Sequence, residues 1–193
     1  MKKRMIVASN NKGKIQEIKQ IFSDFDIITI GEIEEQLNKK ITLIEDKDTF
    51  KDNAIQKVKR LISEIDENIL CMADDSGLSI DALNGFPGVK TARWLDGSDH
   101  DKNIELLKLM KNEKNRSARA ITAIAIGDKN LLNVVECYID GKIANQIAGN
   151  NGFGFDEIFE LDNGRTLAEL SSDEKNIVSA RKEALNKIKT YIY

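Results

Sequence analysis

The chain has 193 residues, of which 41% are hydrophobic and 32% are charged, so it can bury a sizeable core beneath a solvated surface. Its 12 glycines and single proline exclude a fibrous or low-complexity chain. The formal net charge of −3 gives no overall attraction to nucleic acid or to an anionic membrane, so a polyanionic ligand requires a local cluster of lysine and arginine.

Length and cysteine content favour one cytoplasmic domain, residues 1–193, over modules joined by a linker. The apolar run Met5–Ala8 is too short for a signal sequence, and no stretch reaches the ~20 apolar residues of a membrane span. Cys71 and Cys137 lie within apolar runs, which is typical of buried free thiols in a reducing compartment, although the sequence leaves a single disulfide open. We expect a protein that binds neither nucleic acid nor membranes.

The first predicted elements are a strand over Met5–Ala8 and a helix after it, whose apolar residues recur at three- and four-residue spacing at Ile15, Ile18, Ile21 and Phe22. A second helix is predicted to begin at Thr49, because Thr49 and Asp52 resemble a capping box. The continuous apolar run Ile69–Ala73 predicts a fully buried strand that stops at Asp74.

The middle of the chain alternates loops with regular elements. Gly85–Gly88 is predicted to be a loop, and Ile104–Met110 a short helix. Ala118–Ile126 and Leu131–Ile139 are predicted to be paired strands across a turn at Gly127–Asn130.

The C-terminal part is predicted to be a glycine-rich loop over Gly149–Asp156 and then one long helix. Ser171 and Glu174 have the spacing of a capping box at the start of that helix, and its inward positions include Ile177, Ala184 and Ile188. Interleaved strands and helices with a hairpin indicate an α/β fold, with a mixed, twisted central sheet flanked by helices.

The segment between the first strand and its helix is a candidate phosphate site. A helix N-terminus presents unpaired N–H groups and a partial positive charge, and Lys14 would add a full charge. The segment lacks the P-loop pattern, and an ordinary capped helix with a solvated lysine remains the alternative. The candidate residues are Ser9, Asn10, Asn11, Lys12, Gly13 and Lys14.

The adjacent carboxylates Asp74 and Asp75 follow a predicted buried strand. Such a pair can hold Mg²⁺, or hold it and polarise a water molecule, and active sites of open α/β sheets favour this edge. Glu45, just before the Thr49 helix, is a candidate further carboxylate. Solvated acids in a turn are the alternative interpretation.

Further along the chain, Phe153 and Phe155 lie on the glycine-rich loop, where they either stack on a nucleotide base or close the mouth of the core. Lys175 and Arg181 are six residues apart and do not share one helical stripe, so they either touch different parts of a long ligand or form a solvated face. His100, the single histidine, has no partner histidine or thiolate cluster and is expected at the surface start of a helix.

Taken in order, these segments resemble the inosine triphosphate pyrophosphatase family (XTP/dITP diphosphatases) over almost the whole chain. The N-terminal matches to the family's motifs are Ser9, Asn11, Lys14, Glu45, Thr49, Phe50, Asp52, Asn53 and Ala54. The later matches are Ala73–Leu78, Gly85, Pro87, Gly88, Ala92, Arg93, Phe153–Asp156, Ala168–Leu170, Glu174 and Lys175.

The resemblance implies a homodimer of two-lobed subunits with the active-site cleft between the lobes. It implies Mg²⁺-dependent hydrolysis of purine nucleoside triphosphates with non-standard bases (ITP, dITP and XTP) to the monophosphate and pyrophosphate. Asp75 is then the general base and, with Glu45, a magnesium ligand. The implied phosphate or sugar contacts are Lys14, Lys57, Ser76 and Arg93. The implied base pocket is Phe153, Gly154, Phe155 and Asp156, and the last helix brings Lys175, Ala180 and Arg181 to the substrate.

The chain departs from the family's pattern at positions that bear on selectivity for the base. Ala180 stands where the family has histidine, Glu157 where it has proline, and Lys47 where glycine is common. A pyrophosphatase with another base preference therefore remains an alternative. So do a receiver-like phosphoacceptor module and a non-catalytic sensor of magnesium nucleotides. Whether Asp74 also contacts the metal is left open by the sequence.

Overall fold

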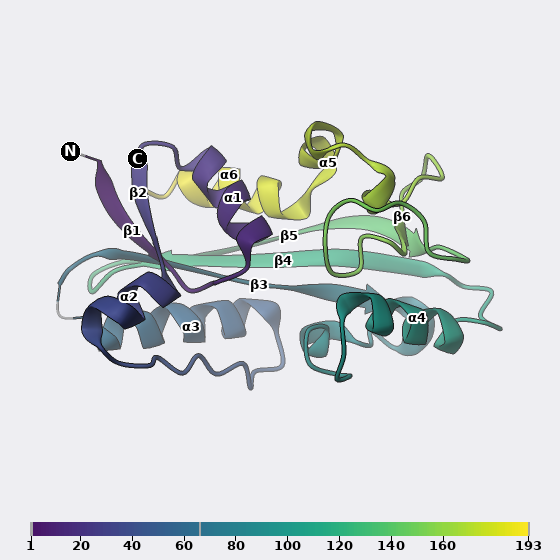
Figure 1. The fold of residues 1–193 in the computed structure, drawn as a ribbon, viewed down its shortest axis with the longest axis horizontal. Coiled ribbons are helices and arrows are strands. Elements are labelled where there is room, and N and C mark those ends of the chain that lie inside the picture. Colours follow the sequence, from purple (N-terminus) through teal and green to yellow (C-terminus); the bar gives the residue numbers. More distant parts are fainter. Residues whose placement is uncertain (1, 66, 193) are drawn as a thin grey trace. The chain divides into compact units, whose positions relative to one another are not determined.

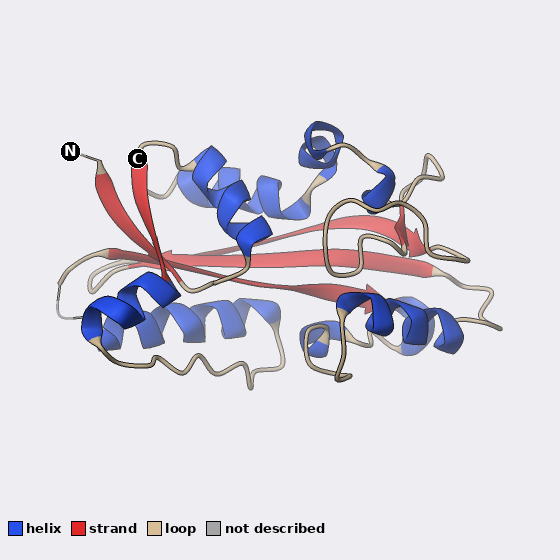
Figure 2. Cartoon of the chain, viewed as in Figure 1, coloured by secondary structure: helices blue, strands red, loops and turns tan. Residues whose placement is uncertain are grey.

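A computed structural model describes residues 2–65 and 67–192 (Figures 1 and 2). Within them, six strands form a sheet with the order β2-β1-β3-β4-β5-β6. β1 pairs in parallel with β2 and β3, whereas β5 and β6 are antiparallel, so the predicted mixed sheet is confirmed. The strands are β1 (Lys3–Val7), β2 (Phe25–Thr29), β3 (Leu70–Ile80), β4 (Ser117–Gly127), β5 (Leu132–Ile143) and β6 (Phe159–Glu160).

The helices of the described residues are α1 (Lys12–Ile21), α2 (Ile30–Leu37), α3 (Phe50–Glu64), α4 (Asp99–Leu109), α5 (Ser172–Val178) and α6 (Ala180–Lys189). Short 3₁₀ turns occur at η1 (Asp81–Leu83), η2 (Gly88–Lys90) and η3 (Leu167–Glu169). In this part of the chain, no helix has both the length and the apolar character that crossing a bilayer requires.

The chain divides into two compact units, and one boundary falls within β3, between Asp75 and Ser76. The first unit is Met1–Asp75, Thr122–Cys137 and Arg181–Tyr193, and the second is Ser76–Ile121 and Tyr138–Ala180.

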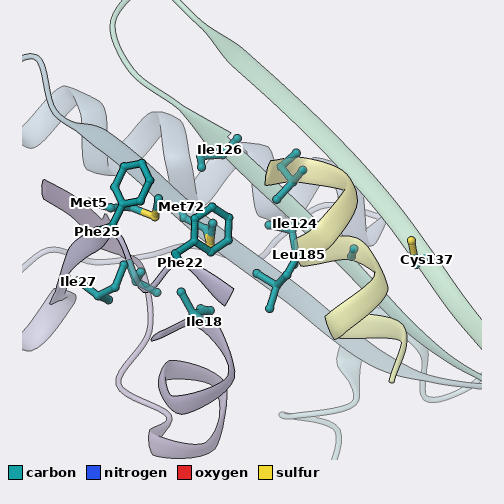
Figure 3. Packing of buried hydrophobic residues seen from close by; sticks show 13 residues of the cluster. Met5, Ile18, Phe22, Phe25, Ile27, Met72, Ile124, Ile126, Cys137 and Leu185 are labelled. Carbon is teal, nitrogen blue, oxygen red and sulfur yellow. The ribbon is translucent and has the colours of Figure 1, made fainter. Parts of the chain in front are cut away.

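In the first unit, α1 and α6 cover one face of the sheet and α2 and α3 cover the other (Figure 1). Phe22, Met72 and Leu185 converge in the core beneath α1 and α6 (Figure 3) and are fully buried. Burying each such side chain contributes about 1.5–3 kcal/mol. This packing fixes the end of β1 and the first half of β3, next to which the candidate residues lie.

The second unit has its own core, which includes Leu78 of β3, Leu106 of α4 and Phe159 of β6. α4 begins with a capping box in which Ser98 accepts from the Asp101 N–H and the Asp101 carboxylate accepts from the Ser98 N–H. Leu106, near the end of α4, is buried in this core and anchors the helix within the unit.

Several sequence predictions are confirmed. Thr49 caps α3, with its Oγ1 accepting from the Asp52 N–H at 3.1 Å. The hairpin strands meet across a turn in which the Asp128 N–H donates to the Leu131 carbonyl at 2.9 Å. Within the described residues, Cys71 and Cys137 are buried free thiols.

The strand predicted over Ile69–Ala73 was expected to stop at Asp74. That end is wrong, because β3 continues without interruption to Ile80. Asp74 and Asp75 are therefore strand residues, and both are buried. Aspartate and glycine are rarely found inside strands. Here cations from distant segments balance the charge of the two carboxylates, so the segment forms a strand in spite of its local preference.

The predicted single C-terminal helix is also wrong. α5 ends at Val178, Ser179 has extended backbone (φ −80°, ψ 121°), and α6 begins at Ala180. Ile177, predicted to point inward, is 83% exposed. The sequence did not predict β2 or α2 at all.

Candidate functional site

The side chains of the loop after β1 mostly hold its own backbone. Ser9 Oγ accepts from the Asn11 N–H at 3.1 Å, and Asn11 Oδ1 caps α1 by accepting from the Lys14 N–H at 3.1 Å. Asn10 Oδ1 accepts from the Gly31 N–H at 3.0 Å, which ties the loop to the first turn of α2. Lys12 is exposed and Gly13 is half-buried within α1. The loop is thus a braced support for the amino-terminal turn of α1.

The Lys14 ammonium that the sequence placed at this loop lies 2.8 Å from Oδ2 of Asp74. Arg181 of α6 approaches the same oxygen with Nε at 3.4 Å and contacts Glu17 Oε2 with Nη1 at 2.9 Å. Burial of Asp74 raises its pKa, but Lys14, Arg181 and Lys57 together lower it further, so the net pKa lies well below the usual range. Asp74 is therefore charged at neutral pH, and it pairs with Lys14 and Arg181.

The pKa of the neighbouring carboxylate, Asp75, is shifted in the opposite direction to that of Asp74. Its Oδ2 accepts from Asn53 Nδ2 at 3.0 Å, and its Oδ1 lies 3.4 Å from Lys57 Nζ. Burial raises the pKa of Asp75 above its ordinary value, Glu45 also raises it, and Lys57 and Asn53 lower it only in part. Adjacent acids with opposite pKa shifts are typical of acid–base sites. Asp75 is therefore a candidate general base.

Lys57 of α3 lies among the predicted metal ligands. Its Nζ is 2.7 Å from Glu45 Oε1 and 2.6 Å from the backbone carbonyl oxygen of Asp74, in addition to the contact with Asp75. Burial lowers the pKa of Lys57, but the surrounding carboxylates raise it above its ordinary value. The side chain is 6% exposed and charged, and it holds Glu45 and Asp75 close together.

The oxygens around Lys57 suit a hard divalent cation. Mg²⁺ prefers oxygen ligands and is often bound by one or two carboxylates, with waters and substrate phosphates completing its coordination. Glu45 and Asp75 supply two carboxylates of that kind. Across residues 2–65 and 67–192, no three His, Cys, Asp or Glu side chains gather in a metal-holding group. Glu45 and Asp75 are therefore the two residues that could hold such a cation.

In the second unit, Asp156 and Lys175 organise the glycine-rich loop. Asp156 Oδ2 accepts from the Phe153 N–H at 2.8 Å and from Lys175 Nζ at 2.5 Å. Lys175 Nζ also lies 4.6 Å from the centre of the Phe153 ring, within cation–π range. A Cβ at Gly152 would lie 2.0 Å from Asp156 Oδ2, so this tight loop requires glycine there. The result is a cationic group beside a half-buried aromatic face.

The remaining predicted residues have varied surroundings. Phe155 packs against Phe159 with ring centroids 6.0 Å apart, so it serves the core of the second unit. Ser76 is a half-buried residue of β3, and Arg93 is exposed after η2. Ala180, at the start of α6, is buried.

The structure gives a role at the site to Asn53, which the sequence showed only as a motif match, and to Glu17, which the sequence did not single out. Asn53, fully buried, holds Asp75, and Glu17 holds Arg181. Asn53 precedes Lys57 by four residues, so the two lie on one face of α3, and this spacing was a signal in the sequence. Glu17 had no such local signal, because its partner lies 164 residues further along the chain.

The described residues thus bring the predicted residues together as two groups, each within one unit. The first group contains Lys14, Glu45, Lys57, Asp75 and Arg181. The second contains Phe153, Asp156 and Lys175.

Comparisons with known proteins agree with the motifs that the sequence showed. The Ham1 family matches residues 5–191. A dITP/XTP pyrophosphatase of Clostridium perfringens is 39% identical, covering 97% of this chain and 96% of that protein, and one of Staphylococcus aureus is 37% identical, covering 98% and 96%. The solved Staphylococcus aureus Ham1 protein has a TM-score of 0.87 at 34% identity, and a HAM1 protein from Coxiella burnetii has 0.86 at 31%, each with 98% of both chains covered. The chain belongs to the Ham1 family.

Proposed function

We propose that this chain is a pyrophosphatase that hydrolyses purine nucleoside triphosphates with non-standard bases, XTP, dITP and ITP, to the monophosphate and pyrophosphate. The observation that carries the proposal is the pair Asp74–Asp75 within one buried strand, with opposite pKa shifts and cations on both sides. Relatives covering nearly the whole chain are named dITP/XTP pyrophosphatases, which supports the substrate class.

In this proposal a water molecule attacks the α-phosphorus, and Asp75 Oδ1 or Oδ2 takes its proton. The bond from the α-phosphorus to the bridging oxygen breaks, and pyrophosphate leaves with the bonding electrons. Lys14, Lys57 and Arg181 neutralise the charge that develops on the phosphate oxygens, which is the main requirement of phosphoryl transfer. Glu45 and Asp75 would hold Mg²⁺, which when bound supplies further positive charge.

The purine base of the substrate is assigned to the glycine-rich loop Gly149–Asp156 of the second unit. Phe153 offers a half-buried ring, and the Asp156–Lys175 pair holds the loop backbone. Ser76 and Arg93 are assigned to the sugar and phosphates, and Ala180 to the surroundings of the substrate. Because Ala180 and Glu157 differ from the family's pattern, we expect them to influence the order of preference among XTP, dITP and ITP.

We also propose that the protein works in the cytoplasm as a homodimer. The buried free thiols of Cys71 and Cys137 suit a reducing compartment. Light scattering of the purified protein should give about twice the chain mass of 21.7 kDa, and the monomer mass would contradict the dimer.

The direct test is a product analysis. With XTP and Mg²⁺ we expect the monophosphate and pyrophosphate in equal amounts, whereas orthophosphate as the inorganic product would contradict the proposal. The Asp75→Asn variant should lose about 10²–10⁴ in kcat, as expected for loss of a general base, while it still binds nucleotide. Asp26→Asn, at an exposed position on β2, is the matched control. Full turnover by Asp75→Asn would remove Asp75 from the mechanism.

A further inference from the structure

Gly154, in the middle of the glycine-rich loop, is held by polar contacts with α4. Its N–H donates to Asp99 Oδ2 at 2.9 Å, and its carbonyl oxygen accepts from Asn103 Nδ2 at 2.9 Å. Asp99 and Asn103 are four residues apart, so both side chains lie on one face of the helix. One helix face therefore binds both polar backbone groups of a single loop residue.

The space beside the Cα of Gly154 is open. A Cβ built on this residue would meet no described atom within 4 Å, and its φ of +66° is in the left-handed region that favours glycine. Gly154 directly follows Phe153, the residue whose ring is assigned to the base. Hydrogen bonds, and not side-chain packing, hold this residue in place.

Asp99 and Asn103 thus form a clamp on Gly154, and the hydrogen bonds of this clamp extend to Glu157. Asn103 Nδ2 lies 3.3 Å from Glu157 Oε2, and His100 Nδ1 lies 3.0 Å from the same oxygen, where the imidazole N–H donates. Asn103 is 2% exposed, whereas Asp99 and His100 are exposed. A buried amide thus links the loop at Gly154 and at Glu157, and exposed side chains reinforce each end.

We propose that Asp99 and Asn103 are positioning residues for base recognition, which hold Gly154 so that Phe153 presents its ring to the purine. This inference rests on the proposed function. Neither side chain needs to touch the substrate, because each acts through the loop backbone. Losing the clamp lets the loop adopt other conformations, so discrimination between bases falls more than the chemical step does.

The test uses Asp99, because its exposed side chain can be changed with little effect on the core. Asp99→Ala removes the acceptor for the Gly154 N–H, and Asp99→Asn keeps an oxygen at the same place. Glu105→Ala removes an acid from the same helix that pairs with Lys108, so it is the control. For each variant we would measure the ratio of kcat/KM for XTP to that for ATP, and hydrogen exchange at the Gly154 amide.

We expect Asp99→Ala to lower the XTP-to-ATP ratio about tenfold and to speed exchange at Gly154 by at least about tenfold, since a hydrogen bond to a charged group is lost. Asp99→Asn, which keeps an uncharged acceptor, should have a smaller effect on both quantities, and Glu105→Ala should keep the wild-type ratio and exchange rate. Asn103→Leu, which removes both amide donors, should lower the ratio in the same way. A purely structural role would instead lower the melting temperature and the turnover of both nucleotides equally.

The possible failures are distinguishable. Faster exchange with an unchanged ratio would overturn the positioning role and leave the proposed function intact. Unchanged exchange in Asp99→Ala would show that the clamp does not hold the loop. If the wild-type protein released no pyrophosphate from any nucleotide, both the proposed function and this inference would fail.

Discussion

The ammonium nitrogen of Lys57 lies 2.7 Å from Oε1 of Glu45, so a buried lysine and a half-buried predicted magnesium ligand form an ion pair in the first unit. The same nitrogen is 2.6 Å from the carbonyl oxygen of Asp74. This lysine compensates acids that the fold would otherwise bury with excess negative charge.

Replacing Lys57 should therefore harm both folding and catalysis. Lys57→Met leaves carboxylates uncompensated, which costs about 3–5 kcal/mol for a buried pair. It should also lower kcat for XTP about 10²–10³-fold, by removing a cation from the developing charge. Urea unfolding and initial rates would measure the two effects.

Lys59→Met, at an exposed position on the same helix, is the matched control and should change stability by less than about 0.5 kcal/mol. The double variant Lys57→Met/Glu45→Gln should recover part of the lost stability, because it removes one uncompensated charge. Wild-type stability and rate in Lys57→Met would contradict the role given to this residue.

The contact between Asn10 and Gly31 predicts that an alanine at Gly31 weakens substrate binding while Asn10 is present and stabilises the fold once Asn10 is removed. A Cβ at Gly31 would lie 2.9 Å from Asn10 Oδ1, so Gly31→Ala should displace the Asn10 side chain and loosen the Ser9–Lys14 loop. We expect the KM for XTP to rise several-fold. In an Asn10→Ala background the clash is absent, and Gly31→Ala should then be stabilising by about 0.4–1 kcal/mol through its effect on the unfolded chain. Equal effects in both backgrounds would contradict the clash.

The ion pair of Glu174 with Arg165 predicts a pH dependence. Hydrogen bonds from Arg165 and then from the Ser171 N–H lower the pKa of Glu174 from 4.5 to about 2. Because the folded pKa lies below the unfolded one, the charged form stabilises the fold above pH 4.5, and this contribution is lost as the pH falls toward 2. Glu174→Gln keeps a capping oxygen without the charge.

The wild type should consequently be more stable than Glu174→Gln above pH 4.5, and the difference should shrink toward zero near pH 2. Chemical unfolding at a series of pH values would measure it. A difference that stays constant from pH 7 to pH 2 would exclude the ion pair as its source.

The sequence pattern placed Ile177 of α5 on the inward face of the helix, but the structure predicts that this residue tolerates a charged substitution. Because its side chain is 83% exposed, Ile177→Lys should change the free energy of unfolding by less than about 0.5 kcal/mol. Leu185→Ala, on the buried face of α6, should cost about 2–5 kcal/mol in the same experiment. A large loss of stability in Ile177→Lys would mean that another surface covers this residue.

Local sequence patterns predicted the elements whose cause is local. Asn11 caps α1 and Thr49 caps α3 with contacts made within three residues. The hairpin strands alternate around a short turn. Such features depend on neighbours in the chain, so spacing and turn chemistry are enough to find them.

The sequence could not show where distant contacts override local preference. The Asp74–Gly77 segment has the composition of a turn, but it is strand because Lys14 and Arg181 balance Asp74 from positions 60 and 107 residues away. α5 and α6 share a continuous helical pattern, and the extended backbone at Ser179 separates them. Tertiary contacts explain the first feature, and nothing in the local sequence pattern marks the second.

The central claim is tested most directly by kcat/KM for XTP, dITP, ITP, GTP and ATP with Mg²⁺, measured by pyrophosphate release. We predict that XTP, dITP and ITP exceed GTP and ATP by at least about 10²-fold, the discrimination that polar contacts to a base can supply. Equal values for all five, or no pyrophosphate from any of them, would contradict the account.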